Sequence, residues 1–72
     1  MTVKVAIEYA DGSYSEDDLP LGILARYDRL VQQGLEGRAL VDKLITDDWA
    51  APPIRVRMTF FGDGGTRTVQ VM

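Results

Sequence analysis

The segment whose residue types are most suited to binding chemistry is "FFGDGGTR", residues 60–67. Its three glycines lie beside an aspartate, a threonine and an arginine, which a phosphate-binding loop or a calcium loop would use. A phosphate-binding loop must lead into a helix whose free amides meet the anion. The residues after Gly65 instead alternate with period two, which is a strand pattern. A calcium loop needs several oxygen ligands, and Asp63 stands alone. We therefore expect a turn.

Two acidic runs suggest a metal site, Glu16-Asp17-Asp18 and Asp47-Asp48. Because histidine and cysteine are absent, such a site would consist of carboxylates and would suit magnesium or calcium. The first run fits the beginning of a helix, where carboxylates complement the positive end of the helix dipole. The second run has the wrong sign for a helix carboxyl end, and we interpret it as surface. No metal and no cofactor is expected.

The sequence is poorly supplied with catalytic residues. Ser13 and Ser15 lie in a predicted turn without an evident base, so the usual pair of nucleophile and base is hard to assemble. Paired carboxylates can hydrolyse a glycoside, and tyrosine or lysine can transfer protons. A chain of 72 residues leaves little room for a deep pocket, however. The expectation is a binding protein and not an enzyme.

The amino-terminal residues 2–9 alternate between apolar and polar, which predicts a half-buried strand. Asp11-Gly12 has the residue types of a type I′ turn. A short return strand through Tyr14 or a loop would follow it. Residues 15–20, "SEDDLP", favour a helix start, with carboxylates as caps and Pro20 in the first turn.

Two helices are predicted between this start and the paired prolines Pro52-Pro53. The first ends at Gly34, a residue suited to a left-handed carboxyl cap. The second begins at about Glu36 and must end before the prolines. The apolar stripes are Ile23, Leu24, Tyr27, Leu30 and Val31 in the first helix and Leu40, Val41, Leu44 and Ile45 in the second.

The carboxyl-terminal segments "IRVRMTFF" and "TRTVQV" alternate with period two and predict a β-hairpin. A loop of two or four residues places Met58 opposite Val69 and Phe60 opposite Arg67. Arg67 is then the polar exception, close enough to the turn to reach water. A three-residue loop would pair the apolar side chains with Thr and Gln instead. The predicted inner face comprises Ile54, Val56, Met58, Phe60, Val69 and Val71.

The opposite face of this hairpin contains the candidate interaction residues. It presents Arg55, Arg57 and Phe61, and arginine beside an exposed aromatic is enriched at protein interfaces. Single-stranded nucleic-acid platforms have the same composition, and an ordinary solvated sheet face is the alternative. Trp49 either closes the end of the core or anchors an interface. The predicted interaction residues are therefore Arg55, Arg57, Phe61 and Trp49.

The charge distribution favours a protein partner over nucleic acid. Residues 1–53 have ten acidic and five basic side chains, and the basic excess is confined to residues 54–72. A sequence pI near 4.6 is unlike the basic footprint of most nucleic-acid-binding domains. No apolar run approaches the length of a membrane span, and no signal-peptide pattern is present. With no cysteine to form disulfides, we expect a cytoplasmic protein without membrane association.

These patterns predict a single small α+β domain over residues 1–72, with the helices packed on one face of the sheet. The first strand would pair with the hairpin, in parallel or antiparallel. Because apolar burial barely offsets chain entropy at this size, a homodimer is expected, through a sheet edge or the arginine-bearing face. The expected function is that of a protein-binding module, a small regulator or an inhibitor. A single-stranded nucleic-acid binder using the same face is the alternative.

Overall fold

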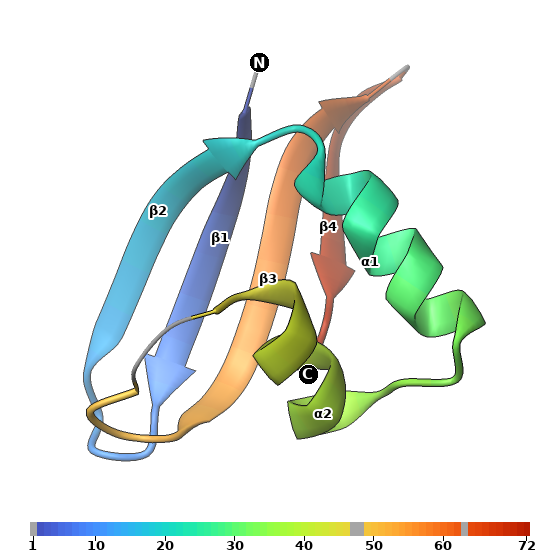
Figure 1. Cartoon of the computed structure of the whole chain (residues 1–72). Helices are drawn as coiled ribbons and strands as arrows, with labels where there is room; N and C mark the ends of the chain where they lie inside the picture. The colour runs from blue at the N-terminus through green and yellow to red at the C-terminus, as the bar shows by residue number, and fades with distance from the viewer. Residues whose placement is uncertain (1, 47–48, 63) are drawn as a thin grey trace.

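The computed structural model describes residues 2–46, 49–62 and 64–72, and in these residues two helices lie on one side of a four-stranded sheet (Figure 1). The elements are β1 (Thr2–Tyr9), β2 (Tyr14–Pro20), α1 (Ile23–Gln32), α2 (Gly37–Leu44), β3 (Pro53–Gly62) and β4 (Gly65–Gln70). The strand order is β2-β1-β3-β4, with every neighbouring pair antiparallel. The predicted α+β class and the order of strand, helices and hairpin are confirmed, and β1 pairs antiparallel with β3.

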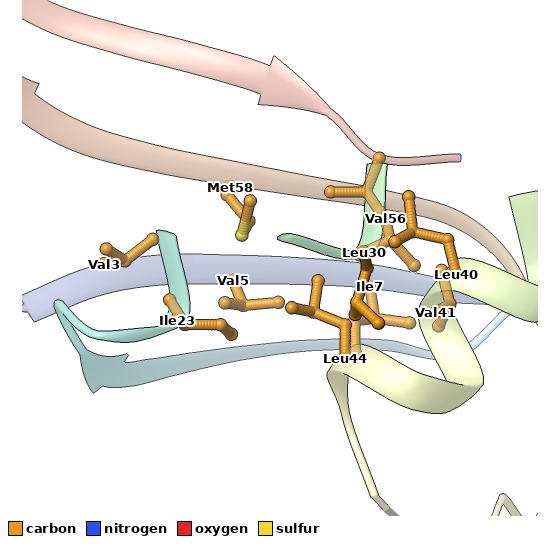
Figure 2. Packing of buried hydrophobic residues seen from close by; sticks show 11 residues of the cluster. Val3, Val5, Ile7, Ile23, Leu30, Leu40, Val41, Leu44, Val56 and Met58 are labelled. Atoms are coloured by element: carbon orange, nitrogen blue, oxygen red, sulfur yellow. The ribbon is translucent and has the colours of Figure 1, made fainter. Parts of the chain in front are cut away.

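The core lies between the sheet and the helices. Figure 2 shows side chains from β1, β3 and both helices pointing toward one another. The buried apolar residues are Val3, Val5, Ile7, Ile23, Leu30, Leu40, Val41, Leu44, Val56, Met58 and Val71. Burial of each side chain of this kind stabilises the fold by about 1.5–3 kcal/mol. Among the described residues no polar or charged side chain is buried, so this cluster is the main source of stability.

The turn between β1 and β2 differs from the predicted type I′. A type I′ turn needs positive φ at both central residues. Gly12 has φ +86°, but Asp11 does not have a positive φ, because only glycines do among the described residues. The Gly12 amide donates to the Tyr9 carbonyl at 3.0 Å, and the Asp11 carboxylate accepts from the Ser13 amide at 2.9 Å. This is the common three-residue hairpin loop, a tight turn followed by a left-handed glycine.

Residues 15–20 continue from this turn as strand β2, so the predicted helix start was wrong. β2 pairs with β1 along its length, with Asp17 opposite Val5 and Glu16 opposite Ala6. The local preference of carboxylates for a helix start is weak, and pairing with an adjacent strand outweighs it. The carboxylates therefore do not cap α1, whose N-cap is Gly22, without a side-chain hydrogen bond.

The helices otherwise follow the predicted pattern. Gly34, at φ +87°, follows α1 as the predicted left-handed residue. On α2, Leu40, Val41 and Leu44 are buried as expected. Val31 was predicted to face the core but is 45% exposed. It lies at the margin of the helix face that Ile23 and Leu30 bury.

The predicted hairpin register is confirmed. Met58 pairs with Val69 and Phe60 with Arg67, while Gly62 pairs with Gly65 across a two-residue loop. Arg67 is exposed, as predicted for a polar residue near the turn.

Ile54 is the exception to the predicted inner face, because it is 57% exposed. The register between β1 and β3 shifts at this point, where Glu8 pairs with Arg55 but Tyr9 pairs with Pro53. The extra residue forms a β-bulge, which reverses the alternation of side chains. Pro53 is buried in place of Ile54.

This bulge predicts unequal effects for two truncations on β3. Met58→Ala removes a fully buried side chain and should lower the free energy of unfolding by about 2–5 kcal/mol. Ile54→Ala, the matched control, should change it by about 0.5 kcal/mol or less, because the side chain is exposed. Urea denaturation measures both. A loss at Ile54 as large as that at Met58 would show that Ile54 is buried and that the bulge is wrong.

Candidate functional site

The sheet face opposite the helices, here called the outer face, is open to solvent. Side chains alternate along each strand, so burial of Val5 and Met58 under the helices directs the intervening residues to the outer face. Phe61 is 72% exposed there, the highest value among the exposed large hydrophobic residues described. The outer face comprises Lys4, Ala6 and Glu8 of β1, Tyr14, Glu16 and Asp18 of β2, Arg55, Arg57, Thr59 and Phe61 of β3, and Thr66, Thr68 and Gln70 of β4.

The cations of the outer face differ in their partners. Arg55 Nη1 lies 3.4 Å from Glu8 Oε1, and Lys4 Nζ lies 3.6 Å from Glu16 Oε1. Both pairs are exposed and contribute about 0–1 kcal/mol. Arg57 lies opposite Ala6 on one side and Gln70 on the other. Among the described residues it takes part in no ion pair, so its guanidinium is the cation available to a partner.

The β2 side of the outer face is acidic. The Tyr14 hydroxyl donates to the Glu16 carboxylate. This hydrogen bond, with a smaller effect of Lys4, lowers the pKa of Glu16. The same hydrogen bond raises the pKa of Tyr14. Both shifts favour the ionised carboxylate of Glu16 and the protonated hydroxyl of Tyr14. Asp18 adds a second carboxylate opposite Lys4.

The structure places Arg55, Arg57 and Phe61 along one face of β3, but it places Trp49 elsewhere. The Trp49 ring centroid lies 6.0 Å from that of Tyr9, at the end of β1. Its Nε1 donates to Asp42 Oδ1 of α2 at 3.3 Å, and the ring is half-buried against the core. Trp49 thus joins the end of the sheet to α2. This matches the first of its two predicted roles, closing the end of the core, and not that of an interface anchor.

The glycine-rich segment forms the turn that the sequence predicts. Gly64 and Gly65 have φ +103° and +116°, and a strand rather than a helix follows them. Among the described residues no group of three or more His, Cys, Asp or Glu side chains is placed to hold a metal ion. Asp47, Asp48 and Asp63, considered above for metal binding, lie outside the described residues.

A groove of about 450 Å³ lies between β2 and the helices, and the sequence interpretation missed it. Its apolar lining comes mainly from Leu19, Ile23, Leu44 and Ile45. One wall of the groove is formed by Leu19 and Pro20 of β2. The sequence signal for it was therefore the apolar Leu19, in a segment that was predicted to start a helix. Arg26, at its wall, donates to the Leu44 carbonyl at 3.4 Å. The lining residues include no pair of nucleophile and base.

No protein-family model matches this chain, and no curated protein or solved structure is significantly similar to it. The functional argument therefore depends on the geometry of the described residues. Neither helix in that part of the chain is long and apolar enough to cross a lipid bilayer.

The Tyr14–Glu16 hydrogen bond predicts how stability depends on pH. The pKa of Glu16 is below its ordinary 4.5 in the folded state. Its contribution is therefore complete above that pH and is lost as the pH falls through the folded-state pKa. The pKa of Tyr14 is above its ordinary 10.0, so its contribution is lost as the pH rises through the folded-state pKa. In an NMR titration, Tyr14→Phe should raise the Glu16 midpoint toward 4.5.

The control for this titration is Tyr27→Phe, because Tyr27 lies on α1, on the other side of the sheet. It should leave the Glu16 midpoint unchanged. An unchanged midpoint in Tyr14→Phe would show that the hydrogen bond does not determine the pKa of Glu16.

Proposed function

We propose that this chain is a protein-binding module, a small regulator or inhibitor of another protein, and that it binds its partner through the outer face. The observation that supports the proposal is that Arg57, without an ion-pair partner among the described residues, shares a strand face with the exposed Phe61. Arginine and aromatic side chains dominate the energetics of protein interfaces. The cysteine-free sequence needs no oxidising compartment, and we expect the protein to act in the cytoplasm.

The position of β3 makes these side chains suitable for recognition. β3 is an interior strand, held by β1 on one side and β4 on the other. Its backbone is therefore fixed before binding, which reduces the entropy lost on association. Phe61 lies four positions beyond Arg57, roughly 13 Å along an extended strand. A matching partner presents a carboxylate and, at that distance, an apolar pocket.

The charge balance of the outer face supports a protein partner over nucleic acid. Binding to phosphates depends on a surplus of cations that release counterions. The outer face has as many carboxylates as cations, and Arg55 and Lys4 are already paired with carboxylates. Mixed charges of this kind complement another protein surface. The outer-face charges are Lys4, Arg55 and Arg57 against Glu8, Glu16 and Asp18.

The test is affinity capture from lysate of the host organism, followed by titration of the captured partner. Arg57→Glu should weaken binding by about 2 kcal/mol, roughly 30-fold, and Phe61→Ala should weaken it to a similar extent. Arg67→Glu is the matched control, because Arg67 is also exposed but belongs to the opposite side of the sheet. It should leave the affinity unchanged.

Two results would contradict the proposal. Equal loss of the partner with Arg67→Glu would show that net charge, and not the outer face, determines capture. A shift of single-stranded oligonucleotide by the wild-type protein, steeply weakened by salt and abolished by Arg57→Glu, would assign the outer face to nucleic acid.

A further inference from the structure

The two edges of the sheet differ in their protection against pairing with another chain. An edge strand presents unpaired N–H and C=O groups, which proteins commonly block with charges or proline. β2 contains Glu16, Asp17 and Asp18 in succession and ends at Pro20. β4, with the sequence GTRTVQ, has a single charged residue, Arg67, and no proline. The β4 edge is therefore the less protected of the two.

The hairpin register identifies which backbone groups of β4 point outward. In an antiparallel strand each residue directs both backbone groups to one side, and successive residues alternate. The Val71 amide donates to the Val56 carbonyl at 2.8 Å, so Val71 faces β3. Thr66, Thr68 and Gln70 consequently direct their N–H and C=O groups away from the sheet. All of them are exposed, and no turn or loop hydrogen bond among the described residues uses these groups.

We propose that a second copy of this chain pairs with the edge, β4 against β4 in antiparallel orientation, about a two-fold axis at Thr68. Thr68 then faces Thr68 of the second copy, and Thr66 faces Gln70. In this register the outward N–H and C=O groups of all these residues form hydrogen bonds between the copies. The two sheets become one continuous sheet, with both outer faces on the same side.

The side chains of β4 are compatible with this register. On the outer face the facing residues are uncharged, and on the other face Arg67 lies opposite Val69 of the second copy. Pairing of β2 with β2 would instead bring carboxylates together, which destabilises a sheet. Pairing of β2 with β4 is head-to-tail and continues into a filament. Pairing of β4 with β4 uses the same edge in both copies, so the assembly stops at a dimer. This inference does not depend on the proposed binding of a partner protein.

Disulfide trapping tests the register, because the sequence has no cysteine and each variant introduces a single thiol. Thr68→Cys places two thiols at the axis, where the Cα atoms of facing residues lie about 5.5 Å apart, within disulfide range. Thr66→Cys is the matched control on the same strand and face. Its two thiols lie about 13 Å apart along the strand. Mild oxidation should give about tenfold more covalent dimer from Thr68→Cys.

Sedimentation equilibrium of the wild-type chain should show monomer and dimer without larger species. Thr68→Pro removes an N–H that β3 does not use, which an edge strand tolerates. It should weaken the dimer about tenfold, equivalent to about 1.4 kcal/mol, while circular dichroism remains unchanged. Monomer alone at high concentration, growth into larger assemblies, or equal trapping at positions 66 and 68 would overturn the inference. None of these measurements requires another protein, so they are separate from the test of partner binding.

Discussion

The pairing of β1 with β3 at the centre of the sheet is the constraint on which the remaining structure depends. Val5 lies opposite Met58 and Ile7 opposite Val56, and all four are buried under the helices. Because side chains alternate strictly along a strand, a slip of one residue would exchange the two faces. The arginines of β3 would then enter the core without partners, at a large desolvation cost. Core packing therefore fixes the composition of the outer face.

Period-two alternation was sufficient to predict the hairpin and its register, because both loop lengths compatible with the apolar pattern place Met58 opposite Val69. It was not sufficient to predict the exposure of Ile54. The bulge depends on the pairing of Tyr9 with Pro53, and the sequence of β3 alone does not indicate it. The error at residues 15–20 has a different cause. Carboxylates followed by proline favour a helix start locally, and the strand forms only because the Gly12 turn returns the chain alongside β1.

The residues of the candidate site that lie on β3 could be predicted from the sequence, because the strand itself could be predicted. Arg55, Arg57 and Phe61 share a face by alternation alone, whereas the position of Trp49 depends on the path of the chain after α2. The difference between Arg55 and Arg57 arises from β1, where Glu8 faces one and Ala6 the other. The sequence left the direction of that pairing open. The acidic strip on β2 was hidden by its assignment to a helix, so the charge balance of the outer face required the structure.

The outer face and the β4 edge both follow from the register of the three strands β1, β3 and β4. Residues that face each other without mutual hydrogen bonds approach most closely, with Cα atoms about 4.5 Å apart. The most direct measurement is a nuclear Overhauser experiment on the α protons of the labelled protein. The register predicts strong contacts between Val5 and Met58 and between Thr59 and Thr68. Contacts displaced by one residue, such as Lys4 with Met58, would place either Lys4 or the arginines of β3 on the core side and contradict the account.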